Sequence, residues 1–134
     1  MLKTTGMVLL LFIAVPGFSR QYEGATMIQE HGYSDCIELS NDIVRVVLEP
    51  NVGGRVLVYE RSDKNILYSD PEQDGWIWNP EDQLTALHPC GGRFDIGPEK
   101  VISKRPDLFL GPWQAEITGP RSARMISPES PGTG

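Results

Sequence analysis

The sequence has few of the residues that usually build catalytic or metal sites. It contains two cysteines, Cys36 and Cys90, and two histidines, His31 and His88, among 134 residues. No CxxC or HxxxH spacing is present, so we expect no metal site and no cofactor. No complete catalytic motif occurs either, and any activity has to be inferred from weaker signals.

Positive charge is also scarce. The chain has 18 acidic residues against 12 lysines and arginines, which gives a formal net charge of -6. An acidic chain has no general electrostatic attraction for nucleic acid or for an anionic membrane surface. We therefore expect neither partner.

Long apolar runs are missing except near the N-terminus. The run at residues 7–15 follows Lys3 and ends at Pro16-Gly17-Phe18-Ser19. It is too short to cross a bilayer, which needs roughly 20 apolar residues. A basic start, a short apolar core and small residues are typical of a secretory signal. We predict a signal peptide at residues 1–19, export to the periplasm or the extracellular space, and no stable membrane insertion after cleavage. A buried helix or a membrane anchor is the alternative.

In an oxidising compartment the two cysteines could form a disulfide. They lie 54 residues apart, and a loop of that length would stabilise the fold by roughly 4 kcal/mol in the chain-entropy model. The spacing does not show whether their Cα atoms come close. A bridge and two separate thiols both remain open.

The strongest structural signal is the stretch IVRVVLEPNVGGRVLVY at residues 43–59. Two β-rich runs flank the turn at residues 50–54, and in the first run Val44, Val46 and Leu48 alternate against Arg45 and Glu49. Such alternation is typical of a strand with two different faces. We predict strands at residues 43–48 and 55–60.

The rest of the chain also favours strands. We expect further strands at residues 36–39, 66–68, 93–96, 113–118 and 123–126, a polar lead-in at residues 20–33, and no convincing helix. Residues 70–89 hold three prolines and two tryptophans and are predicted to form a long loop, with one helical turn at residues 81–86. The pattern predicts an all-β fold, an antiparallel β-sandwich or barrel.

Domain boundaries follow from these elements. We predict one partial β-sandwich domain at residues 20–126 and an unstructured tail at residues 127–134. A strand-rich chain that stops in such a tail leaves a sheet edge uncovered, so we expect a piece of a longer protein. A frayed tail on a complete small domain is the alternative.

Two segments carry a resemblance to a known family. Residues 41–59 contain the hairpin and its Pro-x-x-Gly-Gly-Arg turn, and residues 87–95 read Leu-His-Pro-Cys-Gly-Gly-Arg-Phe-Asp. Together they resemble the N-terminal portion of the galactose mutarotase-like (aldose 1-epimerase-like) β-sandwich superfamily, especially its secreted, uncharacterised members. The resemblance implies a partial supersandwich whose Leu-His-Gly-Gly loop reaches a sugar. Here Pro89 and Cys90 separate His88 from the glycines. The family's acid–base pair, a histidine and a glutamate, comes mostly from later strands, so the catalytic residues stay unknown.

A sugar site needs hydrogen-bonding groups for hydroxyls and aromatic faces for the ring. The candidate substrate-binding residues are His88, Arg93, Asp95, Trp76 and Trp78. Trp113 is a further aromatic candidate. Each residue has a plainer interpretation: Arg93 with Asp95 as an ion pair, His88 as an idle loop residue, and the tryptophans as caps on a small core.

We therefore expect an exported carbohydrate-binding or carbohydrate-active protein that is catalytically silent as this chain. A complete protein would be a mutarotase-like or epimerase-like sugar isomerase. The alternatives are a non-catalytic exported β-sandwich interaction module and a truncated gene product without independent function.

Overall fold

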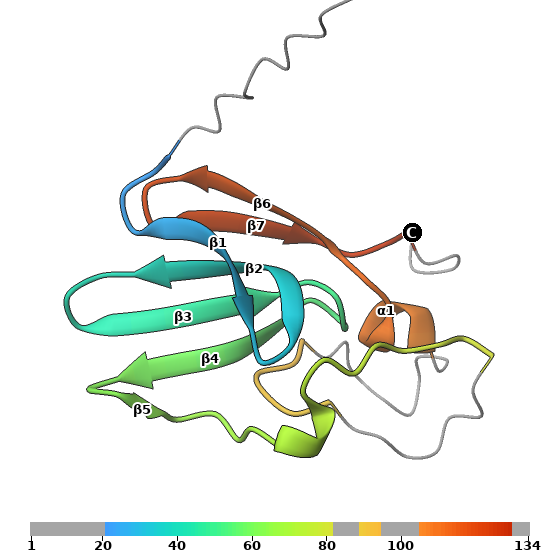
Figure 1. Ribbon diagram of the computed structural model, residues 1–134. Coiled ribbons are helices and arrows are strands. Elements are labelled where there is room, and N and C mark those ends of the chain that lie inside the picture. Colours follow the sequence, from blue (N-terminus) through green and yellow to red (C-terminus); the bar gives the residue numbers. More distant parts are fainter. Residues whose placement is uncertain (1–20, 82–88, 95–104, 130–134) are drawn as a thin grey trace, which may run out of the picture.

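The computed structural model describes residues 21–81, 89–94 and 105–129, and within these ranges the regular secondary structure is mostly antiparallel β-strands with very little helix (Figure 1). One sheet has five strands in the order β1-β2-β3-β4-β5, and β6 and β7 form a second, two-stranded sheet. The predicted all-β, sandwich-like fold is confirmed. The predicted signal peptide at residues 1–19 lies outside the described residues.

The strands of the first sheet follow one another as a meander. Their bounds are β1 Ala25–Glu30, β2 Tyr33–Ser40, β3 Val44–Glu49, β4 Arg55–Arg61 and β5 Lys64–Asn65. The second sheet is a hairpin of β6 Gln114–Gly119 and β7 Ser122–Ile126. Two short helices, η1 Pro71–Gln73 and α1 Pro106–Leu110, lie between the sheets in sequence.

Several sequence-based expectations were wrong in detail. The polar lead-in at residues 20–33 contains β1, and the strand expected at residues 66–68 is replaced by the two-residue β5. Arg93 and Phe94 are not in a strand, and the rest of that expected strand, residues 95–96, lies outside the described residues. Nearly all of the helical turn expected at residues 81–86 also lies outside them. The helix α1 was not expected, because five residues beginning at a proline carry no amphipathic period.

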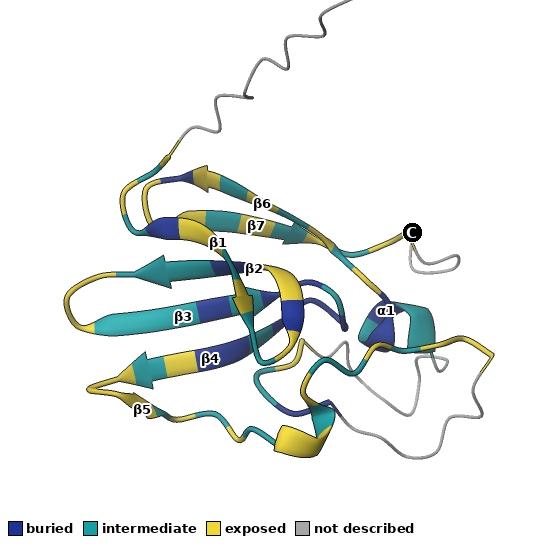
Figure 2. Cartoon of the chain, viewed as in Figure 1, coloured by how far each residue is buried: buried dark blue, intermediate teal, exposed yellow. Residues whose placement is uncertain are grey.

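One face of the five-stranded sheet packs against the β6–β7 hairpin. Directly paired residues share a face, and two cross-strand rows on this face are apolar: Ala25, Leu39, Val46 and Tyr59, and Met27, Ile37, Leu48 and Val56. β6 lies against β1 and β2, and β7 lies against β2. Ala25 and Ile37 are buried there, whereas Tyr59, farther along the row, is 42% exposed (Figure 2).

The hydrophobic core is a cluster on the opposite side of the sheet. It consists of Tyr33, Cys36, Val47, Val52, Leu57 and Val58, with Ile28 and Trp76 packed against it. Trp76 belongs to the loop after η1, so this loop covers the core face. Trp76 therefore serves as the core cap that was the plainer interpretation of this residue.

The turn between β3 and β4 encloses a buried ion pair. Glu49 and Arg55 are 0% and 1% exposed, and Arg55 Nε lies 3.0 Å from Glu49 Oε2. The same carboxylate accepts hydrogen bonds from the backbone N–H groups of Asn51 and Val52. Glu49 thus organises the whole turn, because it satisfies two backbone donors that the turn would otherwise bury.

Removing this carboxylate should destabilise the protein strongly. We expect Glu49→Gln to lower the free energy of unfolding by about 3–5 kcal/mol, because Arg55 is left buried without its counter-charge. Urea unfolding followed by circular dichroism measures the change.

The matched control is Glu116→Gln, which removes the carboxylate of an exposed ion pair with Arg124. An exposed pair contributes less than about 1 kcal/mol, so a small loss is expected there. Equal losses in the two variants would contradict a structural role for the buried pair.

Candidate functional site

The two Gly-Gly-Arg segments, far apart in the sequence, lie side by side. Val56 and Gly92 exchange two backbone hydrogen bonds of 2.8 and 2.7 Å, which form an isolated antiparallel bridge. Arg55 Nη1 donates to the carbonyl oxygen of Cys90 at 2.8 Å. The second segment is thereby fixed to the start of β4.

The glycines of both segments are required by close contacts. Gly53 and Gly54 have φ angles of 66° and 55°, and a Cβ atom at these positions would collide with the carbonyl of Phe109 and the ring of Trp113. Gly91 has a φ of 95°, and a Cβ atom there would lie 2.7 Å from the carbonyl oxygen of Val56. Glycine adopts such angles without strain, so each Gly-Gly pair allows another segment to approach.

An aromatic platform forms at this junction. The rings of Phe94 and Trp113 stack with centroids 6.0 Å apart and an interplanar angle of 20°. Trp113 lies against Gly54, and its Nε1 donates to the carbonyl of Leu108 at 2.9 Å. Phe94 is 52% exposed, and the neighbouring Arg93 is also exposed. We call Phe94, Trp113 and Arg93 the aromatic platform.

The predicted site residues are only partly brought together. Arg93 lies at the platform, whereas His88 and Asp95 lie outside the described residues. Trp76 packs on the core, and Trp78 is half-buried, with an indole N–H that has no hydrogen-bond partner in the described part of the chain. Phe94 was not selected from the sequence. The sequence does contain a signal for Phe94, namely its position directly after the second Gly-Gly-Arg. The aromatic candidates were chosen among the tryptophans, so Phe94 was missed.

The Arg55 guanidinium is held from several sides and has a structural role. In addition to Glu49 and Cys90, it lies over the ring of Tyr33, with Cζ 5.0 Å from the ring centroid. Burial raises the pKa of Tyr33, and Arg55 opposes that shift. Because the charge of Arg55 is already paired with Glu49, we do not include Arg55 among the binding groups.

The two cysteines are free thiols, both buried. Cys36 Sγ faces the carbonyl of Tyr33, and Cys90 Sγ accepts the N–H of Asp70 at 3.4 Å. Of the two possibilities left open by the spacing, the structure has separate thiols. Burial, reinforced by the nearby carboxylate of Glu49, raises the pKa of Cys36 to about 12.

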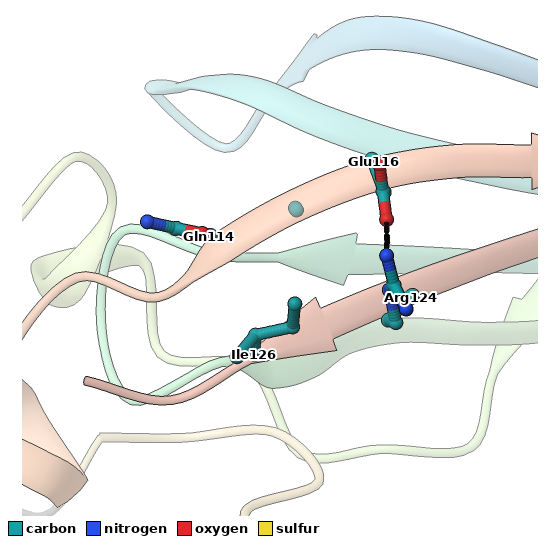
Figure 3. Close-up of a pocket in the computed structure, with 5 residues that line it drawn as sticks. Gln114, Glu116, Arg124 and Ile126 are labelled. Atoms are coloured by element: carbon teal, nitrogen blue, oxygen red, sulfur yellow. Dashed lines mark hydrogen bonds and ion pairs between the residues drawn. The ribbon is translucent and has the colours of Figure 1, made fainter. Parts of the chain in front are cut away.

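Two hollows elsewhere suit a sugar less well. The first, of about 200 Å³, lies on the outer face of the β6–β7 hairpin and is lined by the Glu116–Arg124 ion pair, Gln114, Ala115 and Ile126 (Figure 3). It is smaller than the roughly 300 Å³ at which ligand pockets usually begin. The second, of about 460 Å³, lies between the β2–β3 and β4–β5 turns and has no aromatic residue in its lining.

Comparisons with known proteins and searches for other site types add no assignment. No protein-family model, curated protein or solved structure matches this chain. Within residues 21–81, 89–94 and 105–129, no group of three or more His, Cys, Asp or Glu residues is arranged to hold a metal ion. None of the helices in these ranges is long and apolar enough to cross a bilayer. The fold and the platform thus define the class only as an all-β, sandwich-like protein.

The raised pKa of Cys36 predicts a specific loss of stability in alkali. The folded state holds the thiol proton more tightly than the unfolded state, so this stabilisation is present below about pH 9 and is lost as the pH rises toward 12. We expect Cys36→Ala to be less stable than the wild type at pH 8. Its free energy of unfolding should then fall less steeply between about pH 9 and 11, by up to about 1.4 kcal/mol per pH unit.

Urea unfolding at a series of pH values measures both slopes. Tyr33, whose pKa is also raised, contributes equally to the two proteins and cancels in the comparison. Parallel slopes for the wild type and Cys36→Ala would contradict a buried, protonated thiol.

Proposed function

We propose that this protein is an exported carbohydrate-binding protein, similar in its N-terminal strands to the galactose mutarotase-like superfamily, and that the sugar stacks on the aromatic platform. The observation that supports this proposal is the half-exposed ring of Phe94, stacked on Trp113 beside the exposed Arg93. An aromatic face binds the C–H side of a sugar ring, and a guanidinium donates to its hydroxyl groups. Both kinds of group therefore occur in adjacent exposed residues, Arg93 and Phe94.

The location of the platform supports the same proposal. The second Gly-Gly-Arg is the segment in which the mutarotase-like resemblance expects contact with a sugar. Backbone hydrogen bonds between Val56 and Gly92 hold this segment in place. The N–H of Gly91 also donates to the carbonyl of Tyr68 at 3.1 Å. A ligand-binding loop held in this way loses little conformational entropy on binding.

Replacing the platform ring should weaken sugar binding. We expect Phe94→Ala to reduce the affinity at least about fivefold, because a central aromatic contact contributes about 1 kcal/mol or more. Titration of the ¹⁵N-labelled chain from residue 20 onward with glucose, galactose and their methyl glycosides measures binding. The Nε1–H resonance of Trp113 is the reporter.

Phe94→Tyr, which keeps a ring at this position, should retain the affinity. The control Ile43→Ala removes an apolar side chain that is 63% exposed at the β2–β3 turn, the other end of the sheet from the platform. Loss of binding in Trp78→Ala with no change in Phe94→Ala would place the sugar at the Trp78 loop and overturn the platform.

We expect no catalysis from this chain. The resemblance implies that the family's acid–base pair comes mostly from later strands. Coupled polarimetry on freshly dissolved α-glucose or α-galactose should show the uncatalysed rate of mutarotation. A rate that increases in proportion to protein concentration would contradict this expectation.

The second candidate function is binding of a partner protein at the same end of the molecule. Ile66 and Tyr68, which are 66% and 74% exposed, lie in the segment whose backbone holds Gly91. Together with Phe94 they expose apolar surface of the kind found in protein interfaces. Lack of binding to every sugar in the panel, with a stable complex formed through Tyr68 instead, would favour this candidate.

A further inference from the structure

The outer edge of β4 has partners at both of its ends. At the far end, β5 pairs with Glu60 and Arg61, and β5 is the last strand of this sheet in the described part of the chain. At the near end, Val56 exchanges two backbone hydrogen bonds with Gly92. The middle of β4 lies between these two contacts. A strand edge with free N–H and C=O groups would be a template for pairing with another chain.

The side chain of Asn65 fills this gap. Its Oδ1 accepts the backbone N–H of Tyr59 at 3.0 Å, and its Nδ2 donates to the carbonyl of Leu57 over a longer distance of 3.4 Å. The backbone N–H of Ile66 then donates to the carbonyl of Tyr59 at 3.0 Å. An asparagine amide carries the same kinds of acceptor and donor as a peptide group. Asn65 therefore bonds to β4 as the peptide group of a neighbouring strand would.

The same oxygen also holds the segment at residues 66–68, which follows β5. Asn65 Oδ1 accepts the N–H of Leu67 at 3.1 Å, and the carbonyl of Tyr68 accepts the N–H of Gly91 at 3.1 Å. The segment is not a strand itself. It is held beside β4 through the amide of Asn65, which is only partly exposed.

The part of β4 that Asn65 covers is well suited to pair with a copy of itself. Residues 56–59 read Val-Leu-Val-Tyr, and β-branched and aromatic residues are favoured in strands. None of these four residues is charged or a proline, which are the residues that oppose pairing at a strand edge. Two copies of such an edge can pair antiparallel, because each strand then satisfies the backbone groups of the other.

We propose that Asn65 is an edge plug: its side-chain amide occupies the backbone groups of β4 that would otherwise pair with β4 of a second copy of this chain. Asparagine side chains that bond to the backbone compete with secondary structure in this way. The plug goes beyond the proposed function and requires no sugar. It keeps the five-stranded sheet closed at β4 although β5 has only two residues.

Replacing Asn65 by alanine should make the protein self-associate. Analytical ultracentrifugation of the full chain compares Asn65→Ala with the wild type over a wide range of concentrations. We expect the average mass of the variant to rise with concentration to at least that of a dimer, whereas the mass of the wild type should not change.

Amide hydrogen exchange locates the association. In dilute Asn65→Ala the amide of Tyr59 should lose about two- to tenfold of its protection, because its N–H no longer has an acceptor. At high concentration the same amide should regain protection, because β4 then pairs with a second copy. The amide of Val47, in the centre of the sheet, is the reference for global unfolding.

The matched control is Asn41→Ala, which removes the same amide from the β2–β3 turn. Asn41 Oδ1 also accepts two backbone N–H groups, those of Ile43 and Val44, each at 2.8 Å. Its loss uncovers no sheet edge, because β2 and β3 each have a strand on both sides. Asn41→Ala should therefore associate no more than the wild type. Equal association of the two variants would indicate general destabilisation and overturn the plug.

Asn65→Asp tests the plug in a protein that keeps the acceptor. Its carboxylate still accepts the N–H groups of Tyr59 and Leu67, and a charge at a strand edge opposes pairing. We expect this variant to stay monomeric, with Tyr59 as protected relative to Val47 as in the wild type. Loss of that protection would overturn the plug, as would an Asn65→Ala variant that stays monomeric at every concentration. Neither measurement involves a sugar, so this proposal and the proposed function fail separately.

Discussion

The buried Glu49–Arg55 ion pair is the interaction on which the rest of the structure depends. Two opposite charges with almost no exposure are tolerated because further hydrogen bonds satisfy Glu49 and two of the three guanidinium nitrogens of Arg55. The third, Arg55 Nη2, has no hydrogen-bond partner in the described part of the chain. Glu49 accepts two backbone N–H groups of its own turn, and Arg55 reaches the carbonyl of Cys90. The pair therefore fixes the β3–β4 turn and, through Cys90, a segment 35 residues away. It couples local turn geometry to long-range contacts.

The proposed binding platform is a consequence of this arrangement. Arg55 holds Cys90, the Val56–Gly92 bridge continues the contact, and Phe94 reaches Trp113 two residues later. The ring of Trp113 in turn packs against Gly54, and the backbone N–H of Trp113 donates to the carbonyl of Pro50 at 2.7 Å. Three segments meet at one turn because glycines leave room for backbone and ring contacts. The platform is thus built on the same turn that the ion pair organises.

The segment at residues 70–76 connects the core to the second Gly-Gly-Arg. Its ring, Trp76, covers the core cluster, while Gln73 accepts from both Tyr33 and Cys90 through different oxygens. At its other side it meets His31 in an exposed pair. The same short segment therefore makes both the buried contacts of Trp76 and Gln73 and the partly exposed contact between Asp74 and His31.

Local chemistry explains which predictions from the sequence were correct. The alternation at residues 43–48 and the Gly-Gly turn gave β3 and β4, because side-chain period and positive φ are properties of neighbouring residues. β1 was missed because its sequence, ATMIQE, is mixed in polarity and both Thr26 and Met27 are exposed. The strand expected at residues 66–68 does not form. Ile66 and Tyr68 have the apolar pattern of a strand, but within the described residues no strand beyond β5 pairs with them.

The sequence by itself determined the all-β class and the hairpin at residues 43–59. Tertiary structure alone decided that Arg55 is buried with Glu49, that Cys36 and Cys90 remain separate thiols, and that Phe94 stacks on Trp113. The physical reason is distance along the chain. Turn geometry and strand alternation act between neighbours, whereas burial, pairing of charges and ring stacking depend on segments that only folding brings together.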